Sequence, residues 1–201
     1  MSLFAPHFAS HRIAWSRAVI LGVLVLIVFG SPPTAMPGWV TELSEMLGFA
    51  LLAAATLWRI WCALFIAGIK DGELATSGPY STVRNPLYLG NFAGAVGFGF
   101  AVEQPYLAVV LALGFALFYP SVVAREEARL SELFGERYLE YRARVPRWLP
   151  DWSLYREPAT VTVSPHRMRG AILDAMWFLW AFALWEFIEE LHSLKLLPTL
   201  F

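Results

Sequence analysis

The chain has 201 residues, of which 58% are hydrophobic and 15% are charged, and its formal net charge is −1. Soluble domains carry about a quarter charged residues, so this composition excludes an ordinary soluble protein and favours a one-domain integral membrane protein. The near-neutral charge excludes a nucleic-acid partner of the usual basic type. The single cysteine, Cys62, lies in an apolar run and is expected to be a small buried side chain. The four histidines lack the spacing of metal ligands, so no metal site is expected.

Apolar stretches of about 20 residues predict membrane-spanning helices. In chain order the candidates cover residues 13–29, 43–69, 87–101, 106–124 and 171–191. Only residues 102–105 separate the third from the fourth, which predicts a helical hairpin. Residues 151–169 are polar and are expected to be irregular. The predicted fold class is therefore all-α, a multi-pass helical membrane protein with about five transmembrane helices.

Basic residues are concentrated in alternate loops of this predicted path. They precede the first stretch, lie between the second and third, and lie between the fourth and fifth: Arg12, Arg17, Lys70, Arg84, Arg125, Arg129, Arg137, Arg142, Arg144, Arg147, Arg156, Arg167 and Arg169. The opposite loops carry only Lys195. Because cytoplasmic loops are enriched in Lys and Arg, we expect the basic loops to face the cytoplasm, from the inner membrane in a bacterium or the endoplasmic reticulum in a eukaryote.

A polar segment, residues 78–90, lies between the second and third stretches. Its Asn85-Pro86 pair is typical of a helix start, because Asn is a preferred N-cap and Pro is preferred at the first helical position. Asn85 either only caps the third helix or also binds a ligand. Free N–H groups at a helix start favour an anion such as a cofactor carboxylate.

Small residues crowd the predicted third helix: Gly90, Gly94, Gly97 and Gly99. These glycines either permit close packing between helices or leave room for a bound cofactor.

A second polar segment begins at Arg125-Glu126-Glu127, where the fourth helix is expected to leave the membrane. If the helix continues, the 3.6-residue period places Glu127 on one face with Leu130, Phe134, Tyr138 and Tyr141. A carboxylate on an apolar stripe needs a partner. The Glu pair therefore either makes surface ion pairs, such as Glu126 with Arg129, or faces a ligand.

Two arginines stand out beside these segments. Arg125 either snorkels to the membrane surface or contacts an anionic group. Arg59 lies inside the second apolar stretch, and a charge within the membrane is a functional candidate by default. A cation–π contact with Trp58 or Trp61, or snorkelling, is the alternative for Arg59.

Together the two polar segments resemble the isoprenylcysteine carboxyl methyltransferase and phospholipid methyltransferase superfamily. The family's Gly-Pro-Tyr, Val-Arg-His-Pro, Tyr and Gly appear here as Gly78-Pro79-Tyr80, Val83-Arg84-Asn85-Pro86, Tyr88 and Gly90. Its paired Glu, Leu, Phe-Gly, Tyr, Tyr and Val-Pro-x-x-Leu-Pro appear as Glu126-Glu127, Leu130, Phe134-Gly135, Tyr138, Tyr141 and Val145-Pro146-Arg147-Trp148-Leu149-Pro150. The chain departs from the pattern at Asn85, because an amide cannot act as an acid or base.

The resemblance implies S-adenosylmethionine as methyl donor, in a cytosolic pocket formed by the loop before helix three and the segment after helix four. It divides the chain into an N-terminal helix and loop (1–39), a methyltransferase core (40–150), and a polar loop with a C-terminal helix (151–201), all within one structural domain. The predicted cofactor contacts are Tyr80, Val83, Arg84, Asn85, Pro86, Tyr88, Gly90, Glu126, Glu127 and Tyr138. The predicted catalytic residues are Arg125, Glu126, Glu127 and Arg59.

The predicted reaction is methyl transfer to a membrane-associated lipophilic acceptor. The acceptor atom is either the carboxylate of an isoprenylcysteine-like substrate or the amine of a phospholipid headgroup. The expected partner is a lipid or lipidated substrate in the bilayer, with no nucleic acid and no metal, and the small-residue faces permit a homodimer. Two other classes stay open: a membrane NADPH-dependent reductase of the steroid-reductase type, and a non-catalytic relative.

Overall fold

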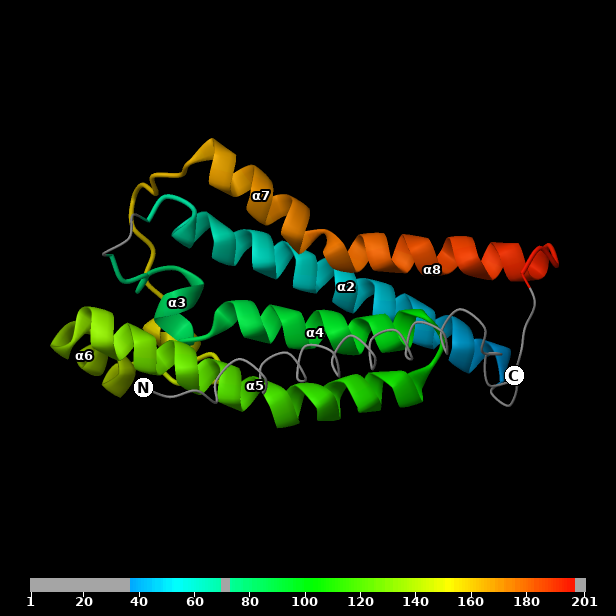
Figure 1. The fold of residues 1–201 in the computed structure, drawn as a ribbon, viewed down its shortest axis with the longest axis horizontal. Helices are drawn as coiled ribbons and strands as arrows, with labels where there is room; N and C mark the ends of the chain where they lie inside the picture. Colours follow the sequence, from blue (N-terminus) through cyan, green and yellow to red (C-terminus); the bar gives the residue numbers. More distant parts are fainter. Residues whose placement is uncertain (1–36, 70–72, 198–201) are drawn as a thin grey trace, which may run out of the picture. The chain divides into compact units, whose positions relative to one another are not determined.

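The computed structural model describes residues 37–69 and 73–197 of the chain, and its regular elements are all helical there (Figure 1). The chain divides into two compact units, one of residues 37–183 and one described over residues 184–197. The predicted helix over residues 13–29 lies outside the described residues.

The helices are labelled as in Figure 1, starting with α2. They are α2 Gly38–Ile66, α3 Pro79–Thr82, α4 Pro86–Ala101, α5 Pro105–Phe134, α6 Glu136–Arg144, α7 Pro165–Ala175 and α8 Trp177–Ser193, with a 3₁₀ turn at Trp152–Leu154.

Three of the described helical segments are long and apolar enough to cross a bilayer: Gly38–Ile66, Pro105–Phe134 and Pro165–Ser193. The 16-residue α4 falls short of that length, since a rise of about 1.5 Å per residue gives it about 24 Å against a hydrocarbon core of about 30 Å. Three candidate spans are therefore present in the described part of the chain, where the sequence predicted four.

Helices α2 and α4 approach each other closely at two glycines. A methyl group on Gly48 of α2 would lie 2.1 Å from the backbone nitrogen of Ala101, and one on Gly97 of α4 would lie 2.8 Å from Leu51 Cβ. The Ser44 hydroxyl also donates to the Phe100 carbonyl at 3.0 Å. The glycines thus bring two backbones together, as small residues do between membrane helices.

Helices α4 and α5 form the predicted hairpin. Residues 102–104 connect them, and the Gln104 amide donates to the Gly99 carbonyl at 3.1 Å. Helix α5 then continues to Phe134, well beyond the predicted apolar stretch, and stops before Gly135, whose φ is +52°. The continuous helix considered for the second polar segment is therefore interrupted, because this positive φ is accessible to glycine and costly for other residues.

Helix α7 begins at Pro165, within the segment predicted to be irregular. Ser164 occupies the N-cap position and Pro165 lies in the first turn, which favours a helix start there. The helix packs against α2: the Arg167 guanidinium donates to the Ile69 carbonyl at 2.8 Å, and Asp174 pairs with Arg59. The polar part of α7 therefore becomes a wall beside the two polar segments.

Candidate functional site

The first polar segment is held in place by the chain that follows α6. Residues 145–156, here called the crossing segment, make three backbone contacts with it. The Arg84 amide donates to the Pro146 carbonyl at 2.9 Å, the Asp151 amide to the Thr82 carbonyl at 2.9 Å, and the Gly78 amide to the Arg156 carbonyl at 2.7 Å. The two motif regions of the sequence thus lie side by side.

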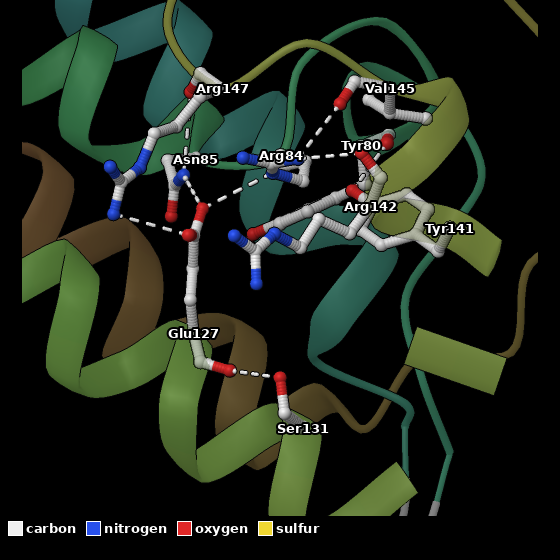
Figure 2. A network of polar contacts seen from close by, with 9 residues as sticks. All are labelled: Tyr80, Arg84, Asn85, Glu127, Ser131, Tyr141, Arg142, Val145 and Arg147. Carbon is white, nitrogen blue, oxygen red and sulfur yellow. Dashed lines mark hydrogen bonds and ion pairs between the residues drawn. The ribbon is translucent and has the colours of Figure 1, made fainter. Parts of the chain in front are cut away.

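Glu127 is the centre of the polar network between these regions (Figure 2). Its Oε1 accepts from Arg84 Nε at 3.1 Å and from Asn85 Nδ2 at 3.2 Å, and its Oε2 pairs with Arg147 Nη2 at 3.1 Å. Its side chain is only 7% exposed. A buried carboxylate of this kind is stable because cations and donors surround it. Glu127 therefore joins α5, the start of α4 and the crossing segment.

Asn85 occupies the N-cap position of α4, but its side chain makes no capping hydrogen bond. Its amide nitrogen donates instead to Glu127 and, at 3.3 Å, to the Arg147 carbonyl. The interpretation that Asn85 only caps the helix was therefore wrong. The Asn85 side chain binds the Glu127 carboxylate on α5 instead of the free N–H groups at the start of α4.

Arg84 is fixed by several acceptors at once. Besides Glu127, its Nη1 donates to the Arg142 carbonyl at 2.7 Å and the Val145 carbonyl at 3.3 Å. Beside it the Tyr141 hydroxyl donates to the Tyr80 carbonyl at 2.7 Å. Burial raises the pKa of Tyr141 above its ordinary value, so its hydroxyl stays a neutral donor. The loop before α4 is therefore rigidly positioned.

A cavity of about 1030 Å³ opens beside this network, at the upper end of the range for small-molecule sites. Five arginines and three carboxylates line it, together with aliphatic side chains from α2, α4 and α5. The predicted site residues along its wall are Arg59, Tyr80, Arg84, Asn85, Pro86, Tyr88 and Glu126.

The other predicted site residues do not line this cavity. Val83 is fully buried, Tyr138 packs in an apolar cluster with Tyr141, and Arg125 is exposed. Gly90 packs against α2, where a methyl group would lie 2.8 Å from Arg59 Cγ. The close-packing interpretation therefore describes Gly90, because the side chains of α2 already fill the space that a cofactor was expected to occupy.

The two glutamates of the pair have different environments. Glu127 is saturated by Arg84, Asn85 and Arg147, whereas Glu126 lines the cavity. Of the two carboxylates, only that of Glu126 therefore lies on the cavity wall, whereas that of Glu127 is held by protein groups.

Arg59 lies at the α2–α7 side of the cavity. Its guanidinium carbon lies 5.5 Å from the ring centroid of Phe178, and its Nη2 pairs with Asp174. The expected cation–π contact is thus present, but the ring belongs to Phe178 rather than to Trp58 or Trp61. Phe178 comes close because a glycine, Gly94, faces its ring.

Sequence reasoning missed two residues of this region. Arg147 was named only among the basic loop residues and as part of the Val145–Pro150 motif, although a basic residue in that motif is a natural partner for the Glu pair. Asp174 is the first acid of the segment Pro165–Ser193, at the point where the polar loop gives way to the apolar helix. The rule that marks intramembrane charges as functional singles out Asp174 as well as Arg59.

The lining residues suit S-adenosylmethionine, which carries an ammonium, a carboxylate and ribose hydroxyls. The Tyr80 hydroxyl is buried and has no hydrogen-bond partner within residues 37–69 and 73–197. A buried donor without a partner is costly, so a polar ligand would satisfy it. Burial raises the pKa of Tyr80 well above its ordinary value, which keeps the hydroxyl protonated. Glu126 and the exposed Arg129 supply the opposite charges that a zwitterion needs.

Comparison with known proteins identifies the class. Residues 44–137 match the family model of phospholipid methyltransferases. Residues covering 38% of the chain are 40% identical to the mouse protein-S-isoprenylcysteine O-methyltransferase, of which they span 27%. The chain belongs to the phospholipid and isoprenylcysteine methyltransferase family, and it is an integral, multi-pass membrane protein.

Two named relatives match almost the whole chain. The cobalt-zinc-cadmium resistance protein CzcN of Cupriavidus metallidurans is 40% identical, over 91% of this chain and 84% of its own length. The nickel-cobalt-cadmium resistance protein NccN of Alcaligenes xylosoxydans is 38% identical, over 94% of this chain and 88% of its own length.

Proposed function

We propose that the chain transfers a methyl group from S-adenosylmethionine to a lipophilic acceptor at the cytosolic face of the membrane. The observation that carries this proposal is the cavity beside the Glu127 network. Its wall holds the Glu126 carboxylate and the Tyr80 hydroxyl, which has no partner among the described residues. Membership of a family of S-adenosylmethionine-dependent methyltransferases supports it.

The chain's own residues would hold the cofactor through complementary charge. S-adenosylmethionine would supply an electrophilic methyl group. Tyr80 would donate a hydrogen bond, Glu126 would accept from the ammonium or the ribose, and Arg129 would face the carboxylate. Glu127 would fix Arg84 and Asn85 without touching the ligand. The apolar wall, including Leu130 and Phe134, would exclude water from the reacting atoms.

The acceptor has to supply a lone pair at the methyl group. A carboxylate already carries one, whereas an amine must first lose a proton. Asn85 cannot take that proton, and Glu126 would be the base for an amine headgroup. A carboxylate acceptor therefore requires no general base among these residues. The lipid part would enter from the bilayer between helices, where apolar chains already partition.

The similarity to CzcN and NccN suggests a cellular role in metal tolerance. We propose that such a role would depend on methyl transfer. A metal-sensitive bacterium that expresses the chain should then tolerate more cobalt or cadmium than one that expresses Glu126→Gln at the same level. Equal protection by both proteins would separate tolerance from the proposed chemistry.

Replacement of Tyr80 by Phe tests the cofactor site with little risk to the fold. The hydroxyl lacks a partner in the described structure, so its removal should leave the melting temperature unchanged or slightly raised. Affinity for S-adenosylmethionine should fall about fivefold to tenfold, the value of one hydrogen bond of about 1–1.5 kcal/mol. Calorimetry on the purified protein in detergent measures both quantities.

Tyr106→Phe is the matched control, because its hydroxyl bonds to Gln104 near the start of α5. It should leave cofactor affinity unchanged. An unchanged affinity in Tyr80→Phe would contradict the role of this hydroxyl. Binding of NADPH in place of S-adenosylmethionine would favour the reductase, and binding of neither would favour a non-catalytic relative.

A further inference from the structure

Arg59 and Asp174 form an ion pair that is buried on one side only. Arg59 Nη2 lies 2.5 Å from Asp174 Oδ2, and the side chains are 11% and 76% exposed, respectively. Both residues line the cavity. An exposed carboxylate regains its hydration when it leaves such a pair, so the partnership adds little for Asp174. A buried guanidinium without an anion is costly. The ion pair therefore stabilises the buried Arg59 more than it stabilises Asp174. Another anion can replace Asp174 at little cost.

Two other arginines in this region are already paired with Glu127. Arg84 is fixed by Glu127 and two carbonyls, and Arg147 also pairs with Glu127. Arg59 differs from Arg84, because its Nε is buried and has no hydrogen-bond partner in the described part of the chain. The Nε of Arg147 has no partner there either, but Arg147 does not line the cavity. A guanidinium presents its donors as a fork that suits a carboxylate or a phosphate. Arg59 thus has donor capacity left for an incoming anion.

The depth of Arg59 suits the headgroup of an amphiphile. It precedes the end of α2 at Ile66 by seven residues, which is about 10 Å along the helix axis. The polar layer on each side of a bilayer is roughly 5–8 Å thick. With Ile66 at the outer edge of that layer, Arg59 would lie just inside the boundary between headgroups and acyl chains. An anionic headgroup can reach it while its chain stays in the bilayer.

We propose that Arg59 binds the anionic headgroup, carboxylate or phosphate, of the amphiphilic acceptor. Asp174 forms an ion pair with Arg59 until the acceptor binds. This rests on the proposed function, because it places an acceptor subsite in the same cavity. When the headgroup replaces Asp174, one of the polar links between α2 and α7 opens. The contact of Arg167 with the Ile69 carbonyl continues to hold the start of α7.

The test measures binding of a long-chain carboxylate and of phosphatidic acid to the full-length protein in neutral detergent, by native mass spectrometry. Asp174→Asn should tighten binding about threefold to tenfold, because it removes the competing anion. Arg59→Gln should weaken binding at least about tenfold, and Arg59→Lys less, because a charge-assisted hydrogen bond is lost or weakened. Arg169→Gln removes an exposed charge from the same helix as Asp174, outside the cavity lining, and should change nothing.

Unchanged amphiphile affinity in Asp174→Asn would overturn the proposal that the headgroup replaces Asp174 at Arg59. This result is decisive even if Arg59→Gln fails to fold. Equal affinity for acetate or inorganic phosphate would overturn the amphiphile as ligand. Binding of S-adenosylmethionine is measured on the same samples. If the wild-type protein does not bind S-adenosylmethionine, the proposed function is refuted while the amphiphile result stands. Its loss in Arg59→Gln with unchanged amphiphile binding would assign Arg59 to the cofactor and overturn this inference.

Discussion

Glu127→Gln is expected both to destabilise the protein and to weaken cofactor binding strongly. The substitution leaves Arg84 and Arg147 without their shared carboxylate, while Arg84 remains only 10% exposed. Removing one partner of a buried ion pair costs about 3–5 kcal/mol, and the partial exposure of Arg147 puts the expected loss near 3 kcal/mol. Affinity for S-adenosylmethionine should fall about a hundredfold, because the loop that carries Tyr80 loses its anchor.

Thermal unfolding followed by tryptophan fluorescence, and calorimetric titration, give the two values. Glu132→Gln is the control, since Glu132 is exposed on the same helix. A Glu127→Gln protein with unchanged melting temperature and unchanged affinity would refute the central role of this network. Lost affinity at unchanged stability would instead show that Glu127 contacts the ligand itself.

Gly48→Ala is expected to have the largest effect on the fold alone. Its methyl group would lie 2.1 Å from Ala101 N and 2.7 Å from Gly97 O, and backbone atoms cannot rotate away as a side chain can. Overpacking of a tight core costs about 1–3 kcal/mol and occasionally more. We expect the upper part of that range, seen as a lower melting temperature and a smaller yield of monodisperse protein.

Gly114→Ala provides a matched comparison, because no atom of the described residues, apart from the neighbouring backbone of its own helix, lies within 4 Å of the position that its methyl group would take. There the same change should be neutral or slightly stabilising, since alanine is a better helix former than glycine. Similar melting temperatures for the two variants would mean that α2 and α4 do not pack through these glycines.

The helical framework follows from local sequence. Apolar runs and their polar breaks predicted α2, the α4–α5 hairpin and the apolar part of α8, because length and hydropathy act within one segment. The end of α5 was missed because a heptad-like face continues through Gly135, and only the backbone geometry shows the break. The early start of α7 was missed although Pro165 follows a serine, a common N-cap.

The sequence predicted most of the residues that lie in and around the site, but not the contacts that each of them makes. Both motif regions meet at the cavity. The sequence could not tell which of Glu126 and Glu127 lines the cavity, because that depends on which glutamate faces Arg84 in the folded chain. The capping interpretation of Asn85 placed the partner of its side chain in its own helix, whereas the actual partner is 42 residues away. Asp174 pairs with a residue 115 positions earlier. Such long-range pairings carry no local signal.

The crossing segment joins the site through main-chain atoms: the carbonyls of Pro146 and Arg156 and the amide of Asp151. Main-chain groups are the same for every residue type except the missing proline amide. Substitution between these contacts therefore leaves them intact, whereas an insertion or deletion shifts one against the next. Variation between Pro146 and Arg156 should consequently be restricted in length throughout, and in composition chiefly at Arg147, whose side chain pairs with Glu127. The spacing of the main-chain contacts thus matters more than most of the residues between them.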